Sequence, residues 1–185
     1  MEESRPVLRE KNLSIDFSDS NGLLRNPFDV AEHDGCSFPV FKNTIWTFRV
    51  SCTNCGTVNE SPVDIDVEHE EDMPGSRGSA NFIMKCKGCK RTVSIHHIAS
   101  HLNLPKLEEI ATKNKLTTDK LQGAFECRGC DIVEWKTGPG FITTSNSSQT
   151  EMSVDLSDGS WADVDENSES CFIDGPESEV VKVKV

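Results

Sequence analysis

The cysteines are the residues of this sequence whose spacing predicts chemistry. In each of the first two pairs, Cys52/Cys55 and Cys86/Cys89, two residues separate the cysteines, so that a tight turn can direct both sulfurs at one ion. Two such turns side by side complete a tetrahedral site of four thiolates, with Zn–S distances of about 2.3 Å. The sequence therefore predicts one Zn2+ per chain, bound by Cys52, Cys55, Cys86 and Cys89.

The residues around these pairs support the zinc site. Gly56 follows the first pair and Gly88 lies inside the second, where glycine lets the chain turn and lets backbone N–H groups reach the thiolates. An apolar residue precedes each pair by two positions, so each is expected to end a strand, as in the knuckles of a zinc ribbon. Four basic residues beside the second pair would offset the thiolate charge: Lys85, Lys87, Lys90 and Arg91.

Two other interpretations of these pairs stay open. They could be unrelated buried thiols, or one could be a thioredoxin-like redox pair. The redox motif occurs where a strand enters a helix. Residues 56–62 are instead typical of turn and strand.

A third pair, Cys127/Cys130, has no fourth pair to complete a site. Phe125 and Gly129 repeat the local pattern of the first two pairs. A tight turn with reduced thiols is the favoured interpretation, with a second metal site or a redox-active pair as alternatives. The isolated Cys36 and Cys171 are expected to take no part in chemistry.

A site closed by four thiolates leaves no position for water or substrate, so the predicted zinc is structural. No catalytic motif accompanies it, and we expect a non-catalytic protein-interaction module rather than an enzyme. One alternative is a metal-handling protein that exchanges zinc or copper through its soft thiolates. A less favoured one is a thiol redox enzyme using Cys127 and Cys130.

Alternating apolar and polar residues predict a mainly β fold, arranged as a β-sandwich or a barrel-like structure. The expected strands cover residues 13–17, 44–51, 63–67, 81–85, 92–98, 121–127, 132–135, 152–156 and 180–185. Turn-forming residues over 18–43 predict a long loop. We expect a zinc-bearing half over 13–104 and a metal-free acidic half over 105–185, packed as one compact unit.

The chain has 19 Lys and Arg against 31 Asp and Glu, a formal net charge of −12 at pH 7. This balance argues against binding to nucleic acid or to an anionic membrane surface, since both need clustered basic side chains. No Lys or Arg occurs from Thr137 to Val181, and the acids there form either a solvated face or a docking surface for a basic protein.

The cellular context follows from what the sequence lacks. Its apolar runs are far shorter than the roughly 20 residues that span a bilayer, and its charged first residues do not resemble a secretory signal. We therefore expect an intracellular protein, cytoplasmic or also nuclear, whose thiols stay reduced. It is expected to be a monomer that binds a protein partner of unknown identity.

Several blocks of sequence occur in a recognisable order. They are Trp46-x-Phe48-x-Val50-x-Cys52-x-x-Cys55-Gly56, Gly75-Ser76-Arg77-Gly78-Ser79-Ala80-Asn81, Lys85-Cys86-Lys87-x-Cys89, Phe125-Glu126-Cys127-Arg128-Gly129, Gly140-Phe141 and Trp161-Ala162-Asp163-Val164-Asp165. Over residues 44–185 the chain thereby resembles the CXXC-motif-containing zinc-binding proteins of eukaryotes. The resemblance implies a β-rich fold of two similar halves, with zinc on the four predicted cysteines, no metal in the C-terminal half and no known enzymatic activity.

Overall fold

The computed structural model describes residues 20–25, 32–37, 39–75, 77–98, 112, 121–174 and 179–183. Strands dominate this part of the chain, as predicted, and no described helix is long and apolar enough to cross a membrane. The strands are β1 (Ser20–Arg25), β2 (Glu32–Asp34), β3 (Val40–Phe41), β4 (Ile45–Cys52), β5 (Val63–Asp66), β6 (Glu71–Asp72), β7 (Ser79–Ala80), β8 (Phe82–Lys85), β9 (Thr92–His97), β10 (Leu121–Arg128), β11 (Cys130–Lys136), β12 (Pro139–Thr144), β13 (Glu151–Asp155), β14 (Ser160–Val164), β15 (Ser170–Asp174) and β16 (Glu179–Val183).

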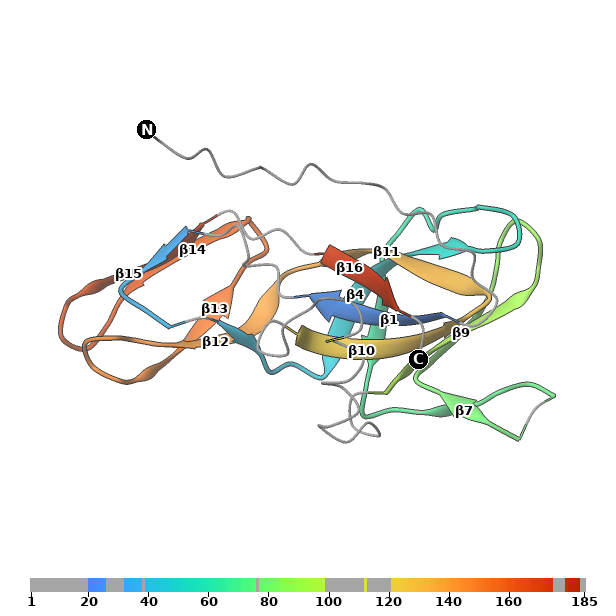
Figure 1. Ribbon diagram of the computed structural model, residues 1–185, viewed down its shortest axis with the longest axis horizontal. Coiled ribbons are helices and arrows are strands. Elements are labelled where there is room, and N and C mark those ends of the chain that lie inside the picture. Colours follow the sequence, from blue (N-terminus) through green and yellow to red (C-terminus); the bar gives the residue numbers. More distant parts are fainter. Residues whose placement is uncertain are drawn as a thin grey trace.

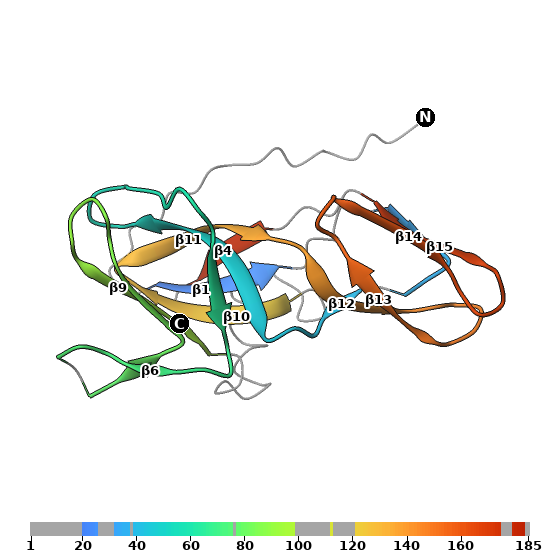
Figure 2. The same cartoon turned by 180° about the vertical axis from the view of Figure 1, so that it is seen from behind.

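The strands form two lobes that lie end to end along the long axis of the molecule (Figures 1 and 2). The larger lobe contains the five-stranded sheet β16-β1-β10-β9-β8, the sheet β11-β4-β5 and the hairpin β6-β7. The smaller lobe contains the sheets β13-β12-β3 and β14-β15-β2. All the recorded strand pairs are antiparallel, and no described sheet closes into a barrel.

Alternation along β4 explains why it is a strand with one buried face. Trp46, Phe48 and Val50 are buried, whereas the residues between them are partly exposed. Phe48 packs edge-on against Phe125 of β10, with ring centroids 5.0 Å apart. The two sheets of the larger lobe are therefore held together by aromatic and branched side chains between them.

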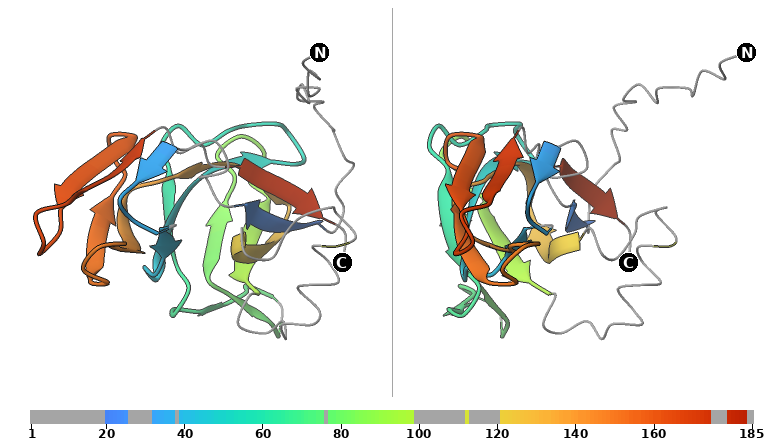
Figure 3. Two further views of the ribbon diagram at one scale, coloured as in Figure 1. Left: turned by 60° about the vertical axis from the view of Figure 1, so that its left-hand side comes forward. Right: turned by 90° about the vertical axis from the view of Figure 1, so that its left-hand side faces the viewer.

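An aromatic cluster joins the two lobes. Phe41 of β3, in the smaller lobe, lies 4.3 Å from Trp46 and 5.3 Å from Trp135, measured between ring centroids, and both tryptophans belong to the larger lobe. Phe141 of β12 lies 4.9 Å from Phe41. Aromatic side chains of both lobes therefore pack against one another, and Figure 3 shows the two lobes obliquely and along the long axis.

Strand pairing crosses the predicted division at residue 104. In the larger lobe, β10 and β11 pair with β9 and β4, although they follow residue 104 in the chain. In the smaller lobe, β2 and β3 pair with β15 and β12, although they precede it. Each lobe is thus completed by strands from the opposite part of the sequence, and the halves 13–104 and 105–185 stay a prediction.

The prediction of a long loop over 18–43 is wrong. Three strands lie in this region, β1, β2 and β3. They form because distant strands supply their partners: β1 lies between β10 and β16, while β2 and β3 add edges to the smaller lobe. Such short strands have no local signature, since tertiary pairing stabilises them despite their turn-forming residues. The strand predicted at 13–17 lies outside the described residues.

Candidate metal centre

The first knuckle begins where β4 ends. The Cys52 N–H donates to the Thr57 carbonyl at 2.9 Å, and the Gly56 N–H donates to the Cys52 carbonyl at 2.9 Å. Gly56 has a φ of 70°, a left-handed conformation that glycine adopts without strain. The chain therefore reverses within a few residues, and both Cys52 and Cys55 lie on this one turn.

The second knuckle, between β8 and β9, repeats the same backbone pattern. The Cys86 N–H donates to the Arg91 carbonyl at 2.8 Å, and the Lys90 N–H donates to the Cys86 carbonyl at 2.9 Å. Here the left-handed residue is Lys90, with a φ of 62°. The second knuckle thus follows a strand and precedes another, as the sequence predicted for Cys86 and Cys89.

The four sulfur atoms converge on one point. The four Sγ atoms all lie within 4.8 Å of one another. The Sγ atoms of Cys52 and Cys89 are 3.6 Å apart, as are those of Cys55 and Cys86. A tetrahedral ion with Zn–S bonds of about 2.3 Å separates its sulfurs by about 3.8 Å. The side chains are thus already close to the spacing that one bound Zn2+ requires.

The surroundings of the sulfurs differ from one cysteine to the next. The Thr57 hydroxyl, 3.2 Å from Cys55 Sγ, and the Thr57 backbone lower the pKa of Cys55 to about 6. The backbone at Arg91 lowers the pKa of Cys89, whereas burial raises the pKa of Cys52 to about 11. The two more exposed ligands are therefore stabilised as thiolates, the form that binds a metal.

Close packing at the centre explains the glycine inside the second pair. A Cβ atom added at Gly88 would lie 2.5 Å from Thr57 Oγ1 and 3.2 Å from Cys55 Sγ. Thr57 is a residue of the site that the sequence prediction missed. Its position just after the Cys-x-x-Cys-Gly block was the available signal.

Cys127 and Cys130 do not join the metal centre. Cys127 lies near the end of β10 and Cys130 begins β11, so the pair flanks a change of strand, at which Gly129 has a φ of 72°. Both side chains are buried, and Cys130 Sγ donates to the Ser94 carbonyl at 3.7 Å. The neighbouring Cys127 thiol and burial raise the pKa of Cys130. The pair therefore flanks a tight turn, as the sequence favoured, and does not form a third knuckle.

The isolated cysteines are buried in the smaller lobe. Cys36 Sγ donates to the Phe172 carbonyl at 3.8 Å, and Cys171 Sγ donates to the Gly35 carbonyl at 3.2 Å. Burial raises the pKa of Cys171. Among the described residues, the cluster that could hold a metal contains neither of them.

A cysteine-free copy of the first knuckle lies in the smaller lobe, directly after β12. The Ser145 N–H donates to the Thr150 carbonyl at 2.9 Å, and the Gln149 N–H donates to the Ser145 carbonyl at 3.1 Å. Gln149 has a φ of 60°, so the spacing and conformation match those of residues 52–57. Sequence reasoning missed this copy, although Ser145 and Ser148 have the same spacing as Cys52 and Cys55.

A two-layered β structure with paired knuckles and four converging cysteine sulfurs defines the class: zinc-ribbon-like proteins with a four-cysteine metal site. The family described as "CXXC motif containing zinc binding protein, eukaryotic" matches residues 37–180. The chain belongs to this family, which confirms the resemblance found in the sequence and the zinc cofactor expected from it.

Relatives and solved structures agree with this membership. The chain is 31% identical to the CXXC motif containing zinc binding protein of Bos taurus over 132 residues, which is 71% of this chain and 79% of that protein. A UPF0587 protein of Saccharomyces cerevisiae is 30% identical over 135 residues, 66% of this chain and 74% of its own. The crystal structure of C1orf123 superposes with a TM-score of 0.66 and 26% identity, covering 90% of this chain and 99% of the other.

Proposed function

We propose that the protein is a non-catalytic interaction module whose larger lobe is held together by one structural Zn2+ on Cys52, Cys55, Cys86 and Cys89. The observation that carries the proposal is the convergence of four sulfurs within 4.8 Å from two matched knuckles. Four thiolates fill a tetrahedral coordination sphere, so no position stays open for a reacting water or substrate.

The place of the centre in the fold supports a structural role. The first knuckle extends β4, which belongs to the sheet β11-β4-β5, and the second connects β8 to β9 in the five-stranded sheet. One ion between the knuckles would clamp these two sheets at one end. Structural zinc sites of this kind contribute an apparent binding free energy of about 10–16 kcal/mol, which becomes folding free energy.

The buried third pair argues against a thiol redox enzyme. A redox-active cysteine needs a lowered pKa and access to its substrate. Cys127 is 6% exposed and Cys130 is 1% exposed, and the pKa of Cys130 is raised. The pair therefore lacks the access to substrate that the redox alternative requires. Cys130 also lacks the lowered pKa.

One observation favours metal exchange as a second candidate function. Cys55 is exposed, so a partner's thiolate could reach the ion from that side. Competition against a chromophoric chelator separates the two functions. Slow release of zinc supports the structural role, whereas release within seconds supports exchange.

The proposal is tested by zinc content and melting temperature of purified variants. Cys86→Ala is expected to lose bound zinc and to melt at a lower temperature. Cys171→Ala removes an equally buried thiol outside the cluster, so it should keep one zinc per chain. Full zinc content and unchanged melting in Cys86→Ala would contradict the proposed site.

Cellular location, oligomeric state and partner belong to the same proposal. An acidic monomer with reduced thiols fits the cytoplasm, or the nucleus, and a protein partner rather than nucleic acid or a membrane. Light scattering tests the monomer, and fluorescence microscopy of the tagged full chain tests the location. A stable dimer, or a tagged chain found in the secretory pathway, would contradict these expectations.

A further inference from the structure

The three strands β8-β9-β10, which are part of the five-stranded sheet, are equivalent to the sheet β14-β15-β2 of the smaller lobe. In the first, Ser94 pairs with Arg128, and in the second Phe172 pairs with Asp34. The carbonyls of Ser94 and Phe172 also each accept a hydrogen bond from the Sγ atom of a buried cysteine, at 3.7 and 3.8 Å. Ser94 and Phe172 therefore occupy the same position in the two sheets.

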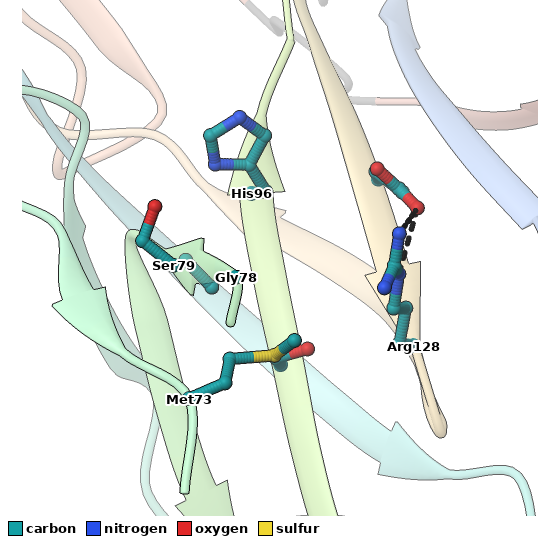
Figure 4. A pocket seen from close by; sticks show the side chains of 8 residues that line it. Met73, Gly78, Ser79, His96 and Arg128 are labelled. Carbon is teal, nitrogen blue, oxygen red and sulfur yellow. Dashed lines mark hydrogen bonds and ion pairs between the residues drawn. The ribbon is translucent and has the colours of Figure 1, made fainter. Parts of the chain in front are cut away.

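The outer face of the sheet in the larger lobe is partly covered. The hairpin β6-β7 packs over β9, and Ser94 is only 5% exposed. A pocket of about 210 Å3 is left between hairpin and sheet, with Met73, Gly78 and Ser79 on one side and His96 and Arg128 on the other (Figure 4). The hairpin thus covers the part of this sheet face that lies over β9.

The equivalent face of the smaller lobe has no such cover within the described part of the chain. Only the short turn 156–159 connects β13 to β14, where the larger lobe has its hairpin between β5 and β8. Phe172 is 37% exposed and Val164 is 59% exposed, and Ala162 beside Phe172 is also exposed. Adjacent apolar side chains therefore face solvent in the smaller lobe, and Phe172 does so at the position where Ser94 is buried in the larger lobe.

The charges around this face have one sign. Asp34, at the position of Arg128 in the larger lobe, and Asp174 are exposed at the same face. No Lys or Arg occurs from Thr137 to Val181. A segment that covered Phe172 would leave these carboxylates without counter-charges unless it supplied basic side chains of its own.

We propose that the outer face of β14-β15-β2 is the docking surface for an extended, basic segment of a partner protein. Apolar side chains of that segment cover Phe172 and Val164, and flanking Lys or Arg side chains pair with Asp34 and Asp174. The segment thereby takes the place that the hairpin β6-β7 has in the larger lobe. This inference rests on the proposed function as an interaction module and names its surface and the chemistry of its partner.

Charge also decides against a second copy of this chain as the occupant. The hairpin that covers the larger lobe has acidic side chains at Glu70, Glu71 and Asp72. If the same hairpin of another molecule approached the smaller lobe, its acids would face Asp34 and Asp174 and repel them. A basic segment from a different protein satisfies both the apolar centre and the acidic edge.

The experiment titrates the zinc-loaded full chain with a synthetic peptide in which lysine alternates with valine. Amide chemical shifts locate the binding, and fluorescence anisotropy measures Kd. The test variant is Phe172→Ser with Val164→Lys, which installs the residues that the larger lobe has at these positions, Ser94 and Lys85. Val133→Lys is the control, because Val133 is 49% exposed in the larger lobe.

We expect shift changes centred on β14 and β15, and Kd weakened by about tenfold or more in the double variant, since two apolar contacts are lost and a like-signed charge is added. The control should bind as the natural chain does, and a peptide with glutamate in place of lysine should not bind. Binding elsewhere, an unchanged Kd in the double variant, or equal binding of the glutamate peptide would overturn the proposal. A dimer that the double variant abolishes would overturn it in favour of a second copy.

Zinc content measured on the same samples separates this inference from the function on which it rests. Peptide binding away from β14 and β15, with one zinc per chain, would contradict the surface and leave the interaction module standing. A chain that binds no zinc would contradict the proposed function itself.

Discussion

In the smaller lobe, Ser145 Oγ donates a hydrogen bond of 2.5 Å to Asp165 Oδ2, at the position that the candidate metal centre occupies in the larger lobe. Ser145 begins the copied knuckle after β12, as Cys52 begins the knuckle after β4. Asp165 directly follows β14, as Cys86 directly follows β8. In the smaller lobe, a hydrogen bond to a carboxylate therefore links two turns. In the larger lobe, the four cysteines would link the equivalent two turns through zinc.

The first prediction concerns this hydrogen bond. Ser145→Ala removes the donor to Asp165, and the Ser145 side chain is fully buried, so water cannot easily replace it. We expect a decrease in melting temperature of roughly 4 °C or more. Ser157→Ala is the matched control, since the Ser157 hydroxyl donates to Asp155 at an exposed position, 2.6 Å away. Equal effects of the two substitutions would contradict a special role for Ser145.

The second prediction is a dependence of stability on pH. The Ser145 hydroxyl, together with backbone N–H groups of Glu169 and Asn167, lowers the pKa of Asp165 to about 2. The unfolded chain has an aspartate pKa of about 3.9. The contribution of Asp165 to the free energy of unfolding is therefore complete above that pH and is lost as pH falls through about 2. Asp165→Asn should reduce the loss of stability between pH 5 and pH 2.

Thermal melts across this pH range, compared with Asp158→Asn, check the second prediction. Asp158→Asn removes one negative charge from the same lobe, on the turn between β13 and β14. If both variants keep the acid sensitivity of the natural chain, Asp165 is not its source.

The third prediction concerns metal removal. Because the smaller lobe links its turns by hydrogen bonds, a chelator should loosen the knuckles 52–57 and 86–91 before the turns 145–150 and 165–169. Hydrogen exchange measured by mass spectrometry would show this order directly. Simultaneous loss of protection in all four turns would mean that the lobes unfold as one unit.

The fourth prediction concerns packing at the metal centre. Gly88→Ala places a Cβ 2.5 Å from Thr57 Oγ1, which forces the Thr57 hydroxyl away from Cys55. Zinc affinity should fall by about tenfold or more, as is typical when groups that orient metal ligands are disturbed. Gly138→Ala is the control, since its nearest added contact is an ordinary 3.6 Å to Ser157 Oγ. Chelator competition that ranks both variants equally would contradict the packing argument.

Sequence reasoning succeeded where the signal was local. The strands around Trp46, Val63 and Phe125 alternate clearly, and the two knuckles carry their cysteines in sequence, so the β fold and the four candidate ligands could be predicted. It failed where structure depends on distant partners. β2 and β3 are two or three residues long and exist because β15 and β12 pair with them.

The true copy of the knuckle was missed for a related reason. Cysteine spacing drew attention to Cys127 and Cys130, whereas the copy at Ser145 contains no cysteine and resembles an ordinary polar loop. The repeated hydrogen bonds and the left-handed conformation of Gln149 identify it. The same backbone geometry thus occurs in this chain with and without cysteines.

X-ray absorption at the zinc edge of the purified protein tests the central claim most directly. The four sulfurs of Cys52, Cys55, Cys86 and Cys89 predict one zinc per chain in a shell of four sulfur neighbours, at distances of about 2.3 Å. A first shell containing oxygen or nitrogen, or fewer than four sulfurs, would contradict a closed structural site.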